Sequence, residues 1–327
     1  MRLEPGRRPS LRSLVAVTVP ALLAGAALPG GGGLAHAAPA GQEARIAVLV
    51  SQDAAPYQEA LQGFRRSLEQ QGIRATVDVY PLHGDGANAA PALQRARQDH
   101  ARLLLTLGSL GTQAAVREAP GLPVVAGLIL NQDDLGKAAN ATGVVLEFPV
   151  ETEFRWLQRL LPKEHNVGVL FNPAENQGRV DAATRVARTI GLTLQARKVE
   201  SPRDLPDALE SLANRADVLW GLADQVVLTP QTVKPILLFS IRNRIPFIGL
   251  SLTWVKAGAL YALDRDYGDI GAQCGELAAK VLQGSAPAAL PPVPPRKVIY
   301  AINMKTAKLL KLDIQEGVLQ GAQSVIE

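Results

Sequence analysis

Two uninterrupted apolar runs, each opening a series of alternating strands and helices, constrain most what this chain can fold into. Residues 45–50 (RIAVLV) and 166–171 (NVGVLF) consist almost entirely of aliphatic, aromatic and β-branched side chains. A strand without polar alternation is typical of a parallel sheet that helices cover on both faces. Alternating strands and helices favour parallel strands joined by right-handed crossovers. The sequence therefore predicts an α/β fold.

The first series follows the run at 45–50. Apolar residues at helical spacing over 56–71 end at Gly72, which predicts a helix there. Further strands are predicted at 74–80, 102–107, 123–129 and 143–146, and further helices at 91–100 and 111–118.

The second series repeats this order after residue 150. It predicts helices at 151–161, 177–190, 206–214 and 233–244, and strands at 166–171, 192–198, 217–221, 247–249 and 259–263. Two groups of strands indicate two Rossmann-like lobes, because a barrel of this class needs eight regular repeats. A Pro- and Ala-rich stretch at 286–295 indicates a crossing or linker.

The amino-terminal residues have the three parts of an export signal. Four arginines precede residue 13, an uncharged apolar run covers 14–28, and Ala35-His36-Ala37 fits a cleavage site. We predict a signal peptide at 1–37 and a periplasmic protein. The apolar run is short for a membrane span, which needs about 20 residues. Arg7-Arg8 leaves the Sec and twin-arginine routes both open. No cysteine lies at the cleavage point, so a lipoprotein is not predicted.

Charge and cysteine content exclude several classes of protein. The chain has 34 basic and 30 acidic residues, and removing 1–37 leaves 30 and 29. Such a balance provides no basic face for nucleic acid. The lone Cys274 excludes an internal disulfide and a cysteine-cluster metal site, and we predict that it is a small buried side chain.

Motifs for catalysis or metal binding are missing from the sequence. The histidines after the signal are His83, His100 and His165, without H-x-x-x-H or H-E-x-x-H spacing. No G-x-S-x-G elbow occurs, and the neighbouring acids Asp133-Asp134 are expected to be solvated. We therefore predict no enzymatic activity, no cofactor and no metal.

Ligands of open parallel sheets bind beyond the carboxyl ends of the strands. In the first series this rule selects Ser51, Tyr57, Ser109, Gly111 and Thr112. The stretch 108–112 joins a strand to a helix start, where backbone N–H groups and the helix dipole attract a carboxylate or another small anion. Alternatively, Ser109 or Thr112 serves only as a helix cap. The spacing matches neither a Walker loop nor a dinucleotide fingerprint.

In the second series the same rule selects Asn172, Asn176, Asp224, Ser251 and Trp254. Asp224 is expected to hold a ligand ammonium, whereas Asn176 also suits a helix N-cap and Trp254 suits either an aromatic wall or the core. We expect Asp224→Ala and Ser109→Ala to weaken binding without unfolding the protein.

Several short motifs carry a family resemblance. Residues 167–176 (VGVLFNPAEN) resemble the VGVLYNPxExNS signature of an ABC-transporter substrate-binding family that has the type I periplasmic-binding fold. Further similar stretches follow the same order along the chain, at 107–115, 258–260, 266–271, 281–284 and 303–308. The joint order of the motifs makes the resemblance specific.

The resemblance implies a Venus-flytrap protein whose lobes are joined by a three-segment hinge. It implies an N-terminal lobe at 44–147 plus 266–288 and a C-terminal lobe at 148–265 plus 292–327. Some relatives bind aromatic amino acids, so an amino acid or similar small carboxylate is expected in the cleft between the lobes. The implied partner is an ABC permease in the inner membrane, and the protein is expected to be a monomer.

Two departures from the family pattern leave the ligand open. The chain has Gly108-Ser109-Leu110-Gly111 where relatives are more compact, and Gln225 follows Asp224 where relatives have Asn or Thr. Two other functions also stay open: a periplasmic sensing protein that partners a membrane sensor, and a secreted enzyme. A repressor-type regulator is disfavoured because the chain begins with an export signal.

Overall fold

The first of two sheets is entirely parallel. The computed structural model describes residues 43–327, so the predicted signal peptide at 1–37 lies outside the described residues. The strand order is β2-β1-β3-β4-β5. These strands are β1 (Ala44–Val50), β2 (Ala75–Pro81), β3 (Leu103–Leu107), β4 (Val124–Ile129) and β5 (Ala141–Val145). The parallel arrangement predicted for this half of the chain is confirmed.

Helices cover both faces of the first sheet. These helices are α1 (Ala55–Gln70), α2 (Ala89–Gln98), α3 (Ser109–Glu118) and α9 (Tyr267–Leu282). Alternate residues of β1 enter different cores: Ile46 and Val48 pack with α1 and α9, whereas Leu49 packs with α2 and α3. Two-sided burial explains the uninterrupted apolar run. Cys274 of α9 is fully buried, as predicted, and burial raises its pKa to about 12.

The second sheet has the order β12-β11-β10-β9-β8-β6-β7. Its strands are β6 (Asn166–Phe171), β7 (Thr193–Lys198), β8 (Val218–Trp220), β9 (Phe247–Gly249), β10 (Tyr261–Arg265), β11 (Val298–Asn303) and β12 (Ser324–Ile326). Its helices are α4 (Val150–Leu160), α5 (Pro173–Thr189), α6 (Leu205–Glu210), α7 (Val233–Asn243), α8 (Leu252–Ala257), α10 (Met304–Leu310) and α11 (Glu316–Gln320). The two α/β sheets confirm the predicted two-lobed class.

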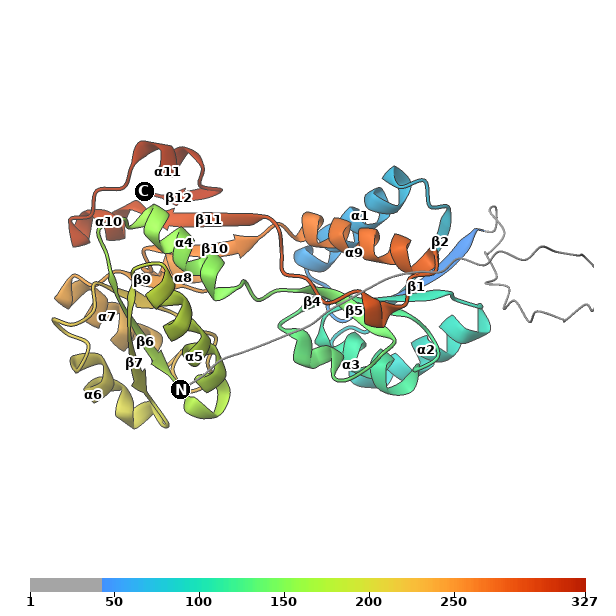
Figure 1. Ribbon diagram of the computed structural model, residues 1–327, viewed down its shortest axis with the longest axis horizontal. Coiled ribbons are helices and arrows are strands. Elements are labelled where there is room, and N and C mark those ends of the chain that lie inside the picture. Colours follow the sequence, from blue (N-terminus) through green and yellow to red (C-terminus); the bar gives the residue numbers. More distant parts are fainter. Residues whose placement is uncertain (1–42) are drawn as a thin grey trace, which may run out of the picture. The chain divides into compact units, whose positions relative to one another are not determined.

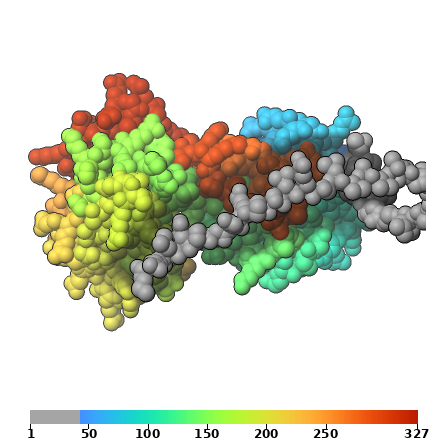
Figure 2. Space-filling model, viewed as in Figure 1, coloured from blue at the N-terminus to red at the C-terminus, as the bar shows by residue number. Residues whose placement is uncertain are grey.

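The carboxyl-terminal part of the chain completes the second sheet and its core. The strict strand–helix alternation predicted only parallel neighbours, yet β11 runs antiparallel to β10. This difference arises because β11 follows a long crossing segment instead of a helix packed on its own sheet. The rings of Trp156 in α4 and Tyr300 in β11 lie 4.9 Å apart. In the space-filling view the red carboxyl-terminal segment accordingly lies beside the lime-green α4 (Figure 2).

The chain passes three times between elements of the first sheet and elements of the second. The crossings are 146–149, 266 and 283–297. In the third, Val293 bridges to Val144 beside β5. The second and first crossings are joined where Arg265 Nε donates to the Leu146 carbonyl oxygen at 2.7 Å. This connectivity is the three-segment hinge of the predicted fold.

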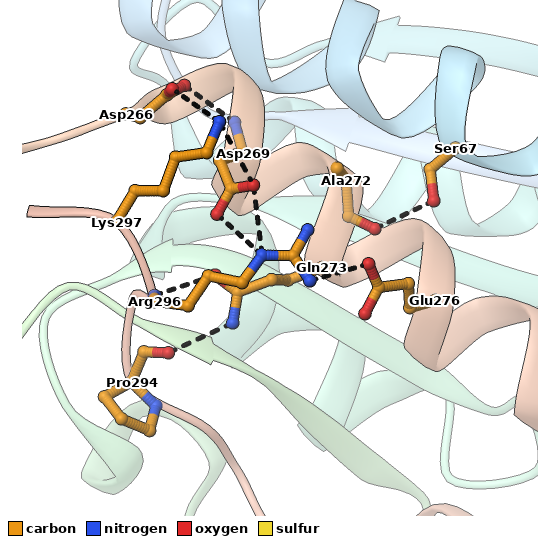
Figure 3. Close-up of polar contacts among 9 residues, drawn as sticks. All are labelled: Ser67, Asp266, Asp269, Ala272, Gln273, Glu276, Pro294, Arg296 and Lys297. Atoms are coloured by element: carbon orange, nitrogen blue, oxygen red, sulfur yellow. Dashed lines mark hydrogen bonds and ion pairs between the residues drawn. The ribbon is translucent and has the colours of Figure 1, made fainter.

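A polar network fastens the third crossing to α9 (Figure 3). Arg296 Nε lies 3.0 Å from both carboxylate oxygens of Asp269, and its Nη1 donates to Glu276 at 2.8 Å. The side chain of Gln273 accepts from Arg296 N and donates to the Pro294 carbonyl oxygen. Both the side chain of Arg296 and the backbone of residues 294 and 296 are therefore held against α9.

Helix starts are the main local difference from the sequence-based expectations. Helix α5 begins at Pro173, four residues before the expected start, because Asn172 caps it by accepting from Ala174 N at 3.1 Å. Asn176, which the sequence suggested as the cap, lies inside the helix and is buried. Helix α3 begins at Ser109 instead of at 111. Within residues 43–327, no helix is long and apolar enough to cross a membrane.

Candidate ligand-binding site

Three of the residues predicted in the first lobe come together where β1 and β3 end. Ser51 Oγ accepts a hydrogen bond from Gly111 N at 3.0 Å. Gly108 has a φ of 92°, and a Cβ there would lie 2.8 Å from Ser51 Cβ and 3.0 Å from a carbon of the Tyr57 ring. Only glycine allows this close approach without strain. The edge of the first sheet therefore gathers Ser51, Tyr57 and Gly111.

Ser109 and Thr112 point elsewhere. The Thr112 hydroxyl is fully buried, donates to the Gly108 carbonyl oxygen at 2.9 Å and lies 2.8 Å from Thr106 Oγ1. The Ser109 hydroxyl donates to Asp134 Oδ2 at 2.6 Å. Neither side chain caps α3, whose N-cap is Gly108 without a side-chain hydrogen bond. Because Gly111 N already donates to Ser51 Oγ, an anion at this helix start would be attracted by the N–H groups of Ser109 and Leu110.

In the second lobe, Asp224 joins the loops that follow β6 and β8. Its Oδ2 accepts from Asn172 N at 2.7 Å and from Asn176 Nδ2 at 2.9 Å. Its Oδ1 accepts from Val226 N at 2.9 Å and Val227 N at 2.8 Å. Four donors fill the acceptor positions of one carboxylate. The geometry therefore favours a loop-organising role for Asp224 over the predicted contact with a ligand ammonium.

The remaining two predicted residues lie where β9 ends. Trp254 packs its ring edge-on against Phe247, with ring centroids 5.6 Å apart, so it belongs partly to the core. Ser251 precedes α8 and is half-exposed, but its side chain makes no capping hydrogen bond. Of this pair, Ser251 has the freer polar group.

A pocket that the sequence did not indicate lies at the carboxyl ends of β8, β9 and β10. Glu153 of α4 and the strand residues Trp220, Gly249, Tyr261 and Arg265 contribute to it. Its remaining lining consists of Phe148, Gly221, Ile248, Leu250 and Leu263. We call this set of residues the second-lobe pocket. It combines apolar walls, two opposite charges and one phenol.

Ion pairs and rings hold the charged residues of the pocket in place. Arg179 of α5 bridges two acids: its Nη2 lies 2.9 Å from Glu153 Oε2, and its Nη1 lies 2.8 Å from Glu147 Oε1. The guanidinium of Arg265 lies over the Phe148 ring, 4.7 Å from its centroid. Both charged groups that face the pocket therefore have fixed positions.

The family model for ABC transporter substrate binding proteins matches residues 43–326. The chain belongs to this family. Substrate-binding proteins of ABC systems act outside the cytoplasm, and their fold agrees with the two sheets and three crossings described above.

Several proteins resemble this substrate-binding protein, one in sequence and two in their solved structures. A tyrosine-binding protein of Clostridioides difficile is 23% identical over 269 residues, covering 78% of this chain and 77% of the relative. The ligand-free, open structure of a substrate-binding protein with adhesive properties from Clostridium difficile has a TM-score of 0.72 at 19% identity, covering 86% of this chain and 99% of that one. A Streptococcus pneumonia domain solved with L-Trp has a TM-score of 0.57 at 22% identity, covering 87% and 100%.

The pocket of this substrate-binding protein contains an unusual carboxyl group. Burial raises the pKa of Glu153 to about 7, and the charges of Arg179 and Arg265 only partly oppose that effect. The charged form of a buried carboxyl group is disfavoured by lost solvation. The pKa of Glu153 is higher in the folded chain than in the unfolded one. At pH values between these two pKa values, the folded state therefore binds more protons than the unfolded state does.

Stability is therefore expected to fall as the pH rises through this window. We expect the free energy of unfolding to decrease from about pH 4.5 to pH 7, by up to about 3 kcal/mol, and the Glu153→Gln variant to lose this decrease. Denaturant titrations of both proteins at several pH values measure the difference. Glu151→Gln, on the exposed side of the same helix, is the control. Its free energy of unfolding should decrease with pH as steeply as that of the wild type. If the free energy of unfolding decreased equally with pH in the wild type and in Glu153→Gln, the role of Glu153 in this pH dependence would be refuted.

Sequence reasoning missed Glu153, Tyr261 and Arg265 of this substrate-binding protein for local reasons. Glu153 lies in the first turn of α4, where an acid is favoured by the helix dipole whatever its function. Tyr261 looked like one more apolar strand residue. Arg265 was the available signal: β10 runs two residues further than 259–263, which places this cation at a strand end.

Proposed function

We propose that this protein is the periplasmic solute-binding component of an ABC-type importer and captures a small ligand, an amino acid or a similar small carboxylate, between its lobes. An ABC permease in the inner membrane receives the solute from the closed protein. The solute leaves chemically unchanged, so the protein is not an enzyme. We also propose that it acts as a soluble monomer that an N-terminal signal peptide directs to the periplasm.

The observation that carries the proposal is the placement of polar groups at the carboxyl edges of both sheets. Ser51 and Gly111 lie at the edge of the first sheet, and the second-lobe pocket lies at the edge of the second. Ligands of open α/β sheets bind at such edges. Support also comes from two relatives, one named as a tyrosine-binding protein and one solved with L-Trp.

Under this proposal, some of the predicted residues contact the solute and others hold the binding loops in position. Ser51, Tyr57 and Gly111 contact the solute from the first lobe, and Ser251 and the second-lobe pocket contact it from the second. Asn172, Asn176 and Asp224 keep the loops of the second lobe in position. A ligand that contacts both lobes stabilises the closed state by the difference in its affinity for the closed and open forms.

Ligand screening of the purified mature protein tests the proposal. We expect at least one of the twenty standard amino acids, or a small carboxylate, to bind in isothermal titration calorimetry. At a hundredfold excess over Kd, binding to the folded state adds about 2.7 kcal/mol of stability. For a protein of this size such a gain corresponds to a rise in melting temperature of about 5 °C or more.

Two controls separate capture from the alternatives. Mass spectrometry of the solute after prolonged incubation should recover it unchanged, and light scattering should give the monomer mass with and without solute. Consumption of the solute would identify an enzyme. No binding by any solute in the screen would overturn the proposed function.

A further inference from the structure

Two neighbouring helices of the second lobe expose large apolar side chains to solvent. Within residues 43–327, five large apolar side chains are exposed, and three of them lie on α7 and α10. They are Leu238 at 58% and Ile241 at 40% on α7, and Leu309 at 61% on α10. Single exposed apolar residues are ordinary, but a group of them on touching elements marks an interaction surface. The polar residues around them therefore indicate what this surface binds.

Helices α7, α8 and α10 are held against one another. Helix α10 contacts α7 directly, and both lie at the left of the ribbon drawing (Figure 1). At the start of α10, Asn303 Nδ2 donates to the Val255 carbonyl oxygen of α8 at 2.8 Å. Thr306 Oγ1 donates at 3.0 Å to the carbonyl oxygen of Gly258, directly after α8. The exposed sides of the three helices therefore adjoin one another.

The exposed polar residues of these helices are mainly basic. The ranges 233–243, 252–257 and 304–310 contain no aspartate or glutamate. Seven exposed cations lie on these helices or directly after α7 and α10: Lys234, Arg242, Arg244, Lys256, Lys305, Lys308 and Lys311. We call these seven cations, together with the three exposed apolar side chains, the basic helix face. The near-equal totals of basic and acidic residues conceal this local excess, because the three helices lie far apart in the sequence.

Acids compensate little of this charge. Arg242 Nη2 lies 3.2 Å from Glu210 Oε2 of α6. The other six cations form no ion pair with any residue of the described chain. Asp313, which follows Lys311 by two residues, is exposed. Seven cations against these two acids leave an excess of five positive charges around three apolar side chains. Such a surface is complementary to an anionic partner.

The apolar and basic side chains share the exposed side of each helix. Residues 234, 238 and 241 recur at helical spacing on α7, as do 305, 308 and 309 on α10. The opposite sides are buried, through Ile236 and Phe239 on α7 and through Ala307 on α10. Aliphatic side chains next to lysines on the solvent side of a helix are typical of helices that lie on an anionic membrane surface.

Lysine content favours a lipid surface over a protein partner. Five of the seven cations are lysines, which are depleted in protein–protein interfaces. A lysine is a point charge on a flexible stem, which suits mobile lipid phosphates. The exposed apolar side chains are aliphatic, so they do not provide the aromatic rings on which nucleic acid bases stack.

We propose that the basic helix face binds the surface of a membrane that contains anionic phospholipids. Leu238, Ile241 and Leu309 enter the head-group layer, and the cations meet the lipid phosphates. Three aliphatic side chains give weak, reversible attachment, so the protein still exchanges between membrane and solution. This inference goes beyond the proposed function and does not depend on which solute is captured. Such attachment keeps the protein close to the membrane in which the proposed permease lies.

Vesicle sedimentation tests the charge requirement. The mature protein without residues 1–37 is used, so the apolar run at 14–28 does not contribute. We expect it to sediment with phosphatidylcholine vesicles that contain about 30% phosphatidylglycerol and not with vesicles of phosphatidylcholine alone. Raising the NaCl concentration from about 0.05 M to about 0.5 M should weaken the binding about tenfold or more, because salt screens the attraction.

Matched charge reversals test the location. The double variant Lys305→Glu, Lys308→Glu should bind the anionic vesicles about 25-fold more weakly or less, since each cation near such a surface contributes about fivefold. The control is Arg185→Glu, Arg188→Glu on α5, two exposed residues with the same spacing and the same change in net charge. Lys308 and Arg188 both lie in the last turn of their helices, so the effect on the helix dipole is matched. The control should stay within about threefold of the wild type.

A second pair of substitutions tests the apolar contact. The double variant Leu238→Ser, Leu309→Ser should weaken binding to the anionic vesicles about tenfold or more, because less apolar surface enters the head-group layer. Both side chains are exposed, so the melting temperature should stay unchanged. Thermal unfolding shows whether each double variant is folded, and the single variants Lys305→Glu and Leu238→Ser replace any that is not.

Four results would overturn the assignment. They are no sedimentation with the anionic vesicles, equal losses in the two charge-reversed proteins, unchanged binding by the leucine variant, and cross-linking to an acidic membrane protein without any binding to vesicles. The last result would make the basic helix face a protein-docking surface. Loss of binding in the lysine and leucine variants, with binding retained in the α5 variant, supports the assignment. Calorimetry with solutes tests the proposed function separately, so neither result decides the other.

Discussion

Replacing Gly271 by alanine should lower the free energy of unfolding by about 3 kcal/mol or more, although alanine is ordinarily the better helix former by about 1 kcal/mol. Gly271 lies in α9, and an added Cβ would lie 1.9 Å from the Ala60 carbonyl oxygen and 2.6 Å from its carbon. These atoms belong to the backbone of α1, so no side-chain rotation relieves the overlap. The two helices must separate, which opens the core of the first lobe.

Glycines make this helix pair unusually close along its length. A Cβ on Gly63 of α1 would lie 1.9 Å from the Gly268 carbonyl oxygen, and one on Gly275 would lie 2.6 Å from Ser67 Cβ. The Ser67 hydroxyl donates to the Ala272 carbonyl oxygen at 2.9 Å. The close side-by-side packing of α1 and α9 in the ribbon view is thus backbone contact (Figure 1). Because α9 also carries the hinge network, the cost of separating the helices extends to the third crossing.

A glycine elsewhere provides the control. Gly178 lies in the exposed part of α5, and a Cβ there would meet no atom within 4 Å. Gly178→Ala should therefore stabilise the protein by about 0.5–1 kcal/mol. Denaturant unfolding of the two variants measures opposite signs for the same chemical change. A stabilising Gly271→Ala would show that α1 and α9 do not touch through their backbones.

Replacing Asp224 by alanine should also cost much stability, about 3–5 kcal/mol, because it leaves four donors without their acceptor. Three of these donors are backbone N–H groups, from Asn172, Val226 and Val227, and they cannot turn toward solvent independently. Asp224 as a whole is 7% exposed, so water does not easily replace its carboxylate. This expectation differs from the one drawn from the sequence, in which Asp224→Ala weakened binding without affecting folding.

The conservative variant distinguishes the two roles of Asp224. Asp224→Asn keeps the size of the side chain but turns one acceptor into a donor that faces N–H groups, so it should cost about 1–3 kcal/mol. Asp313, an exposed aspartate near the carboxyl terminus, is the control, and Asp313→Ala should change stability by less than about 0.5 kcal/mol. Thermal unfolding without solute measures the effect on folding alone. A loss of affinity in Asp224→Ala with unchanged stability would restore the direct contact with a ligand.

Local pattern was sufficient for most helices and strands up to residue 263 and for part of the candidate edge. The runs at 45–50 and 166–171 predicted strands buried on both faces, and β1 and β6 are such strands. Ser51, Tyr57 and Gly111 were located because the end of a parallel strand is visible in the sequence. Helix starts were less certain, since Asn172 and Asn176 are both able to cap a helix and only the fold shows which one does.

Strand β12 and the direction of strand β11 were not recognisable from a local sequence pattern. Strand β12 has three residues, which is too short for its alternation to be recognised. The antiparallel direction of β11 depends on the crossing at 283–297, and the course of that crossing depends on contacts with α9 instead of on its own composition.

The sequence by itself determined the α/β class, the two lobes and the sheet edges at which ligands bind, because burial imposes a period on each element. Only the tertiary structure decided which polar groups at those edges are free. Asp224 looked available and is saturated by donors as far as 52 residues away, whereas Tyr261 looked like a core residue and lines the second-lobe pocket. Whether a polar atom can meet a ligand depends on whether the protein already satisfies it, and those partners come from distant parts of the chain.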